Sequence, residues 1–193
     1  VRTSAACIGQ GMATVTTQIA CETLNLPPEM IVAEAPDTRR TPNSGTTTAS
    51  RQSLFTGEAT RRAAMQLRYE LDMGRALSDL EGEEFYGEYS AKTDPLINDK
   101  KSPVSHAGYG YAAEVAILDD KGKVAKFVAA YDMGQVVNPR AAEGQIEGGI
   151  AMGMGYALTE KFALEEGYVK AKYATLGLVN ATQVPPIETI LVH

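Results

Sequence analysis

Short apolar runs alternate with stretches of helical periodicity in the first half of the chain. The runs at residues 3–8 and 30–35 are typical of strands. Apolar side chains at helical spacing predict a helix over residues 11–24, with Asn25 as its C-terminal cap. The stretch 46–50 leads into a second long helix, which is predicted to run through about residue 71. Four of its residues are predicted to face inward: Leu54, Ala59, Ala63 and Leu67.

The second half opens on the pattern of a β-hairpin. Residues 109–117 and 124–131 are typical of strands, and the sequence DDKG at 119–122 is typical of the turn between them. A glycine-rich helix is predicted next, over residues 138–160. Further short strands are predicted near Phe162 and Val169 and at residues 187–192.

This order of elements predicts an α+β fold, with mixed β-sheets and long helices packed on them. The helices and strands fall into two lobes of strand–helix repeats, at residues 1–90 and 91–193. The polar, irregular stretch 72–104 lies around the boundary, and a short helix is predicted within it at residues 76–84. We therefore expect two small lobes rather than one continuous core.

The helix over residues 138–160 is unusual because it keeps five glycines. They are Gly144, Gly148, Gly149, Gly153 and Gly155. Each glycine inside a helix costs about 1 kcal/mol relative to alanine, so the backbone is expected to lie close to something. One interpretation is tight packing of the helix on a sheet. The other is a helix end pressed against a bulky polar ligand, with Gln145 as a hydrogen-bonding side chain.

Three predicted helix starts are preceded by small or polar residues, at residues 9–11, 44–50 and 138–139. Helix starts expose unpaired backbone N–H groups and the positive end of the helix dipole. Small residues there let an anion approach, so several such ends facing one point would bind a phosphate-bearing cofactor. Ordinary capping is the alternative for each of them.

Composition narrows the possible partners and the compartment. The 193 residues carry a net charge of −6, and the basic residues occur only as scattered pairs, which argues against binding to nucleic acid or to an anionic membrane. Cys7 and Cys21 lie too far apart along the predicted helix for a disulfide, so we expect buried thiols in a reducing cytoplasm. The chain begins with Val1 without a signal-peptide pattern, which favours a piece of a larger protein over a processed chain.

No catalytic constellation can be argued from spacing alone. His106 and His193 stand apart from cysteines and carboxylates, so a metal held by protein ligands is not expected. The sequence GYGYAA at 108–113 matches a dinucleotide-binding pattern only formally, because a strand rather than a helix follows it. The residues therefore point to binding of a polar cofactor between two lobes, without a catalytic residue.

Three strings carry a resemblance to a known family. They are GQGMATVTTQIACETLNLPPEMIVAEAPDT, TPNSGTTTASRQSLFTGEAT and DMGQVVNPRAAEGQIEGGIAMGMGYALTE, in that order. The chain resembles the molybdopterin-binding domain of the xanthine dehydrogenase/aldehyde oxidase family of molybdenum hydroxylases. The start AACIGQGM and the end LGLVNATQVPPIETILVH are most similar to the selenium-dependent xanthine dehydrogenase branch. The resemblance is weakest over residues 72–104.

The resemblance implies a set of cofactor-binding residues at the same three helix starts. The glutamine of the Gly-Gln-Gly motif and the glutamine of the glycine-rich helix would lie beside the cofactor, and the Thr-Ala-Ser loop would give backbone contacts to its pterin phosphate or nucleotide side. The implied residues are Gln10, Thr47, Thr48, Ala49, Ser50, Arg51, Gln52 and Gln145. The metal would be held by the dithiolene sulfurs of the pterin, so no protein ligand to it is implied.

The family reaction is hydroxylation of a purine-like heterocycle or of an aldehyde, with water as the oxygen source. The implied cofactor is molybdenum-molybdopterin, with its cytosine dinucleotide form as an alternative, and iron–sulfur clusters and FAD would sit on other domains or subunits. The family's glutamate base would lie beyond His193, so no catalytic residue is assigned and the isolated chain is expected to be inactive. Alternatives are an aldehyde, nicotinate or other heterocycle hydroxylase of the same family, or a non-catalytic cofactor-binding or structural module.

Overall fold

The computed structural model describes residues 1–95, 97–172 and 174–192, so His193 lies outside the described residues. The chain divides into two compact units, Val1–Tyr109 and Gly110–His193. The sequence put the division at residue 90, whereas the segment 91–109 groups with the first unit. A Cβ atom added to Gly108 would lie 3.9 Å from Cδ2 of Leu54, which shows how this segment approaches the first unit.

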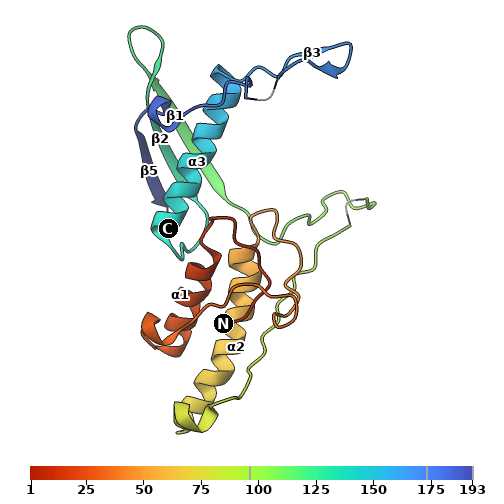
Figure 1. Ribbon diagram of the computed structural model, residues 1–193, viewed down its shortest axis with the longest axis vertical. Coiled ribbons are helices and arrows are strands. Elements are labelled where there is room, and N and C mark those ends of the chain that lie inside the picture. Colours follow the sequence, from red (N-terminus) through yellow and green to blue (C-terminus); the bar gives the residue numbers. More distant parts are fainter. Residues whose placement is uncertain (96, 173, 193) are drawn as a thin grey trace. The chain divides into compact units, whose positions relative to one another are not determined.

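The first unit consists of helices joined by long extended segments (Figure 1). The helices are α1 Met12–Leu24, η1 Pro28–Met30, α2 Gln52–Asp72 and η2 Leu77–Leu80. Asn25 ends α1 in the left-handed conformation with φ 55°, and its backbone N–H donates to Cys21 O, so the predicted cap is confirmed. The short helix predicted at 76–84 is confirmed as η2.

The two strands predicted in this unit are not formed among the described residues. Residues 3–7 and 31–35 belong to no helix and no ladder, whereas Ile8 lies in a bend and Met30 ends η1. The two segments are joined only near the chain start, where the Val1 ammonium donates to Val32 O at 2.6 Å and Glu34 N donates to Val1 O at 3.0 Å. Because a strand needs a continuous partner, two hydrogen bonds around one residue do not establish a sheet. The prediction of strand–helix repeats is therefore wrong for this unit.

Small and hydroxyl-bearing side chains fill the contact between α1 and α2. Thr16 of α1 is fully buried, and α2 buries Thr56, Gly57, Thr60 and Ala64. The close approach is visible at Gly57, where an added Cβ atom would lie 2.8 Å from Cδ1 of Ile19. The prediction of the inward face of α2 is wrong for Leu54, which is exposed. The helix is turned so that its small residues, rather than its larger apolar ones, meet α1.

A segment after η2, residues 82–89, crosses α2 and accounts for two of the predicted inward residues. A Cβ atom added to Gly87 would lie 2.1 Å from Ala59 O and 2.5 Å from Ala63 N. The guanidinium of Arg62 stacks on the ring of Tyr89 at 5.0 Å, and Arg62 also donates to Glu88 O. Ala59 and Ala63 are therefore half-buried beneath this segment and not against α1.

The second unit is a three-stranded sheet with a long helix packed on one face, over two of its strands (Figure 1). The strands are β1 Tyr111–Leu118, β2 Val124–Asp132 and β5 Ile187–Val192, in the order β1-β2-β5. β1 pairs with β2 antiparallel and β5 pairs with β2 parallel, so the sheet is mixed. A separate hairpin joins β3 Leu164–Glu165 to β4 Tyr168–Val169, and η3 spans Ala181–Gln183.

The helix α3 Pro139–Leu158 packs through aliphatic side chains. Ile146 and Ile150 cover the fully buried Ala129 of β2, and four larger side chains surround them: Phe127, Tyr131, Ile187 and Leu191. Long helices together with a mixed sheet confirm the α+β fold class. The hairpin, the glycine-rich helix and the last strand also lie close to where the sequence predicted them.

Candidate functional site

The three predicted helix starts differ in how their backbone N–H groups are satisfied. Asn138 caps α3, because its side chain accepts a hydrogen bond from Ala141 N at 3.0 Å. The start of α1 at Gly11 and that of α2 at Arg51 have no side-chain cap hydrogen bond. Ordinary capping therefore accounts for the third start. At the first start the backbone N–H groups of Gly11 and Met12 face the Cys7 thiol, so it is the start of α2 that keeps backbone donors for a ligand.

The loop before α2 contains two strained residues in succession. Ala49 has φ 52° and Ser50 has φ 51°, both in the left-handed region that residues other than glycine rarely occupy. Such a conformation costs on the order of 1 kcal/mol or more per residue and concentrates at functional sites. These are two of the residues that the resemblance assigned to cofactor contact.

A hydrogen-bond network joins the Gly-Gln-Gly loop to the Thr-Ala-Ser loop. Thr47 Oγ1 accepts from Gln52 Nε2 at 3.0 Å and from Ala6 N at 2.9 Å. The carbonyl oxygen of Ala6 in turn accepts from Gln10 Nε2 at 2.8 Å, and Gln10 Oε1 accepts from Ile8 N at 2.7 Å. Three predicted site residues, Gln10, Thr47 and Gln52, are thus brought together through Ala6.

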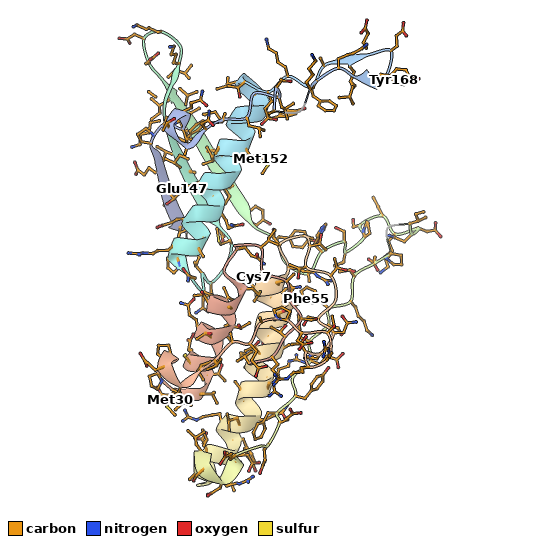
Figure 2. The ribbon with its side chains drawn as sticks, in the orientation of Figure 1. Cys7, Met30, Phe55, Glu147, Met152 and Tyr168 are labelled. Carbon is orange, nitrogen blue, oxygen red and sulfur yellow. The ribbon has the colours of Figure 1, made fainter. Side chains whose placement is uncertain are left out.

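Further contacts fix these loops in place. Ser4 and Ser44 bond reciprocally, each hydroxyl oxygen accepting from the other residue's backbone N–H, at 3.1 and 2.7 Å. Gln52 is buried and its side-chain oxygen accepts from the hydroxyl of Thr56. Arg51 donates to Thr46 O at 2.9 Å, and its guanidinium lies 5.3 Å from the ring centre of Phe55, which Figure 2 labels. Arg51 therefore braces its own loop.

Cys7 lies at the start of α1 and differs from what the sequence predicted. It is exposed, and Cys21 is half-buried, so the expectation of two buried thiols is wrong. The backbone N–H groups of Gly9, and after it those of Met12 and Gly11, lower the pKa of the Cys7 thiol. The position of Cys7 shortly before a glycine-rich helix start is the feature of the sequence that could have indicated a thiol with a lowered pKa.

Gln145 lies on α3 in the second unit. Its side chain is exposed and makes no hydrogen bond with the residues that the structure describes. Nothing lies within 4 Å of a Cβ atom added at Gly144, Gly148, Gly149 or Gly153. The sheet-facing residues of α3 are Ile146 and Ile150 instead. Tight packing on the sheet therefore does not explain these four glycines.

The glycines of α3 leave an open helix face. It also carries Met152, 74% exposed and labelled in Figure 2, and Tyr156, 83% exposed. Gly155 is the exception, because a Cβ atom there would lie 2.6 Å from Oε1 of Glu160. Of the two interpretations of the glycine-rich helix, packing on the sheet therefore fails for the other four glycines. The interpretation of an open face that a ligand could approach remains for them.

The described part of the chain holds neither a cluster of metal-ligating side chains nor a membrane-spanning helix. It contains no group of three or more His, Cys, Asp or Glu side chains that could hold a metal ion. Within residues 1–95, 97–172 and 174–192, no helix is long and apolar enough to cross a membrane. His106 forms a hydrogen bond through Nδ1 with the hydroxyl of Ser105 at 2.8 Å, and its ring contacts that of Tyr109. Both contacts lie within the loop that contains His106.

The chain matches the family model of the molybdopterin cofactor-binding domain over residues 1–83 and 75–185. It is 28% identical to the putative xanthine dehydrogenase molybdenum-binding subunit of Escherichia coli K12, over 86% of this chain and 26% of that protein. It is 29% identical to subunit gamma of the 6-hydroxypseudooxynicotine dehydrogenase complex of Paenarthrobacter nicotinovorans, over 97% of this chain and 28% of that protein.

Solved structures agree with this family. The aldehyde oxidoreductase from Desulfovibrio gigas superposes with a TM-score of 0.82 and 28% identity, covering 99% of this chain and 23% of that one. The chain thus spans about a quarter of the length of the relatives that it matches. Because the family model covers nearly the whole chain, the protein belongs to the molybdopterin cofactor-binding domain family, among the molybdenum hydroxylases that include xanthine dehydrogenase and aldehyde oxidoreductase.

Proposed function

We propose that this chain supplies cofactor-contacting loops of a molybdenum hydroxylase that acts on a purine-like heterocycle. The observation that carries the proposal is the joined pair of loops at the starts of α1 and α2. Gln10, Thr47 and Gln52 hold the two loops together, and the start of α2 has no side-chain cap. A helix start with free N–H groups is suited to a phosphate group, such as the one on molybdopterin.

The proposed site residues divide into those that touch the cofactor and those that position the loops. Thr48, Ala49 and Ser50 lie at or beside the strained turn, and their backbone is the part available to the pterin phosphate or nucleotide. Gln10, Thr47, Arg51 and Gln52 are already bonded within the unit and act as positioning residues. Gln145 has an uncommitted amide, so it is proposed to touch the cofactor directly.

The donor set fits such a group without a protein ligand to the metal. Amide and hydroxyl groups and backbone N–H donors suit a phosphate-bearing pterin, and the open glycine face of α3 leaves room for a bulky one. When bound, the cofactor supplies the molybdenum centre at which the substrate is hydroxylated with oxygen from water. Iron–sulfur clusters and FAD on other domains or subunits are proposed to carry the electrons away.

The purine-like substrate is favoured by the relatives named as xanthine dehydrogenase subunits. A second candidate is an aldehyde, because the aldehyde oxidoreductase of Megalodesulfovibrio gigas is 32% identical over 74% of this chain. The ratio of kcat/KM for xanthine to that for a simple aldehyde separates the two candidates. The cytosine dinucleotide form of the cofactor and the cytoplasmic location belong to the same proposal.

The decisive test replaces Gln145 by alanine in the enzyme that contains this chain. Because Gln145 is exposed and unbonded here, its loss should leave the fold unchanged and lower molybdenum occupancy or turnover by about tenfold or more. Gln135→Ala, at another exposed glutamine of the same unit, is the matched control and should behave as wild type. Molybdenum is measured by elemental analysis and folding by circular dichroism.

Gln10→Ala tests the loops of the first unit separately. The amide of Gln10 holds Ala6 and Ile8, so its removal should loosen the Gly-Gln-Gly loop and reduce cofactor loading. Wild-type molybdenum content and wild-type turnover in both the Gln10 and Gln145 variants would contradict the proposal. A wild-type enzyme that carries molybdopterin but hydroxylates no substrate would instead favour a non-catalytic cofactor-binding module.

A further inference from the structure

On one face of the three-stranded sheet α3 packs over β2 and β5, and the opposite face is not covered by any part of the second unit that the structure describes. Strand register identifies the side chains on it. Ala129 of β2 faces α3, so its neighbours Val128 and Ala130 face away. Directly paired residues share a face, which adds Val115 of β1 opposite Val128, and Ile190 of β5 opposite Ala130.

The uncovered face is apolar at its centre and charged at its ends. We define it by eight side chains: Tyr111, Ala113, Val115, Ile117, Val128, Ala130, Ile190 and Val192. Five of them are large and exposed, at 76% for Tyr111, 58% for Val115, 43% for Ile117, 44% for Ile190 and 40% for Val192. At one end Lys126 pairs with Glu188 at 2.5 Å, and at the other lies Asp132.

An apolar sheet face with a charged rim has the composition of a protein interface. Antiparallel sheets with one solvated face normally alternate apolar and polar residues, so that the solvated face is polar. Here both faces of β1 and β5 carry apolar side chains. Contiguous exposed apolar patches of this kind mark surfaces that another chain or segment covers.

We propose that the uncovered face docks an apolar surface of the same enzyme, contributed by molybdenum-binding polypeptide that lies outside these 193 residues. The inference rests on the proposed function, in which this chain works as one part of a larger molybdenum enzyme. The relatives support this occupant over a second copy, because the same fold occurs there within single chains about four times as long. In such chains additional polypeptide is available to cover the sheet.

The chemistry of the occupant follows from the face. The side chains at the centre of the uncovered face are aliphatic and uncharged. The occupant must therefore present aliphatic or aromatic side chains there. A charge placed at Val115 would be buried and unpaired in the complex. Because an uncompensated buried charge is costly, such a substitution should weaken docking by about 100-fold or more.

Val115→Lys in the whole enzyme is the test, with Val169→Lys as its matched control. The two valines are 58% and 56% exposed, and both lie in strands of the second unit, but Val169 belongs to the separate β3–β4 hairpin. We expect Val115→Lys to lower the yield of assembled enzyme by about tenfold or more and Val169→Lys to leave it unchanged. Equal yields for Val115→Lys and wild type would overturn the proposal.

If Val115→Lys fails to fold, nitration of tyrosines in the unmutated protein tests the docking proposal instead. Tyr111 should be nitrated readily in the 193-residue chain and be protected about tenfold or more in the whole enzyme, since docking would cover it. Equal nitration of Tyr111 in both would contradict docking. A concentration-dependent dimer of the 193-residue chain, lost in Val115→Lys and seen by sedimentation, would assign the face to a second copy and also overturn the proposal.

Molybdenum content separates this inference from the proposed function. If Val115→Lys prevents assembly while the wild-type enzyme carries no molybdopterin, docking holds and the proposed function fails. If the variant assembles normally and is loaded with molybdenum, the docking proposal fails while the proposed function stands. Both readouts come from the same purified enzymes.

Discussion

Glycine has opposite uses in the two units of this chain. In the first unit, Gly57 and Gly87 are points of close contact, since added Cβ atoms would lie 2.8 Å from Ile19 Cδ1 and 2.1 Å from Ala59 O. In the second unit, Gly144 and Gly148 of α3 have nothing within 4 Å. The residue type and the helical setting of Gly57 and Gly148 are the same, yet one glycine permits internal packing and the other leaves a surface open.

The difference teaches that glycine spacing alone does not reveal what a helix face meets. An i, i+4 pair of glycines makes a smooth face, but the neighbour that uses this face lies elsewhere in the sequence. In the first unit the neighbours of the small residues are α1 and the segment 82–89. In the second unit the apolar side chains of α3 meet the sheet, and four of its glycines have no neighbour within 4 Å.

Gly87→Ala and Gly148→Ala test this comparison with one substitution in each unit. The methyl group at position 87 would collide with backbone atoms of α2, so we expect a loss of about 3 kcal/mol or detachment of the segment 82–89. At position 148 the methyl group meets nothing and removes a helix glycine, so we expect a gain of up to about 1 kcal/mol. Denaturant unfolding with hydrogen exchange assigns each change to its unit.

Opposite signs for the two variants support the comparison. Equal destabilisation at both positions would mean that the glycine face of α3 is packed in solution. A stabilised Gly148→Ala chain that then fails to load molybdopterin in the whole enzyme would link the open face to the cofactor.

Local signals predicted the helices and their ends. Asn25 takes the left-handed conformation of a C-cap and Asn138 caps α3, because each of these roles depends on chemistry within a few residues. The hairpin, β5 and the α+β class followed from alternation and turn residues. The three helix starts were singled out by the same local reasoning, whereas the site residues at them were implied by the family resemblance. Their role with the cofactor stays a prediction.

Features that depend on distant neighbours could not be predicted. The apolar runs at 3–8 and 30–35 have strand composition, but the described residues offer them no strand partner. They form only the backbone bonds of Val1 and side-chain bonds such as those to Ser44 and Thr47. Leu54 fits the apolar stripe of α2, yet the helix turns its threonines toward α1, because only small residues allow the close approach at Gly57. The network through Ala6 joins residues about forty positions apart, a distance over which periodicity carries no information.

The cores of the two units give a second contrast, which Gln52→Leu and Gln145→Leu would sharpen. The first unit buries Gln52 with two hydroxyl partners beside its apolar side chains, whereas the buried side chains described in the second unit are all apolar. Removing the buried amide leaves polar partners unsatisfied, so Gln52→Leu should cost about 2 kcal/mol. Gln145→Leu, at an exposed and unbonded amide, should change the free energy of unfolding by less than about 0.5 kcal/mol.

Chemical denaturation of both leucine variants measures these differences. If the Gln52 variant is as stable as wild type, the polar network is not a source of rigidity in the first unit. A large loss in the Gln145 variant would show that this amide has partners in solution and is not free for a ligand.

The smallest expected effect is a contrast in pH dependence. In the first unit, hydrogen bonds from Arg61 and Arg62 lower the pKa of Glu58 from 4.5 to about 2. In the second unit, the hydrogen bond that the Tyr131 hydroxyl donates to Glu114 raises the pKa of Tyr131 above its ordinary value of 10.0. The first unit should therefore lose stability toward acid and the second toward alkali.

Glu58→Gln and Tyr131→Phe isolate the two contributions. The ionised Glu58 contributes fully above pH 4.5, and the difference between wild type and Glu58→Gln should disappear as the pH falls toward 2. Neutral Tyr131 contributes fully below pH 10, and its difference from Tyr131→Phe should disappear as the pH rises through the raised pKa. Because the arginine partners are half-exposed, the acid effect should be about 1 kcal/mol or less.

Hydrogen exchange cannot be compared easily over such a pH range, so unfolding by urea at fixed pH values is the better measurement. We expect the two mutational differences to change at opposite ends of the scale and in separate units. A Glu58→Gln difference that stays constant from pH 6 to pH 2 would show that the arginine pair does not hold this carboxylate in solution. A constant Tyr131→Phe difference up to pH 11 would show that the hydrogen bond to Glu114 does not hold this hydroxyl in solution, because that bond is the largest cause of the raised pKa of Tyr131, ahead of burial.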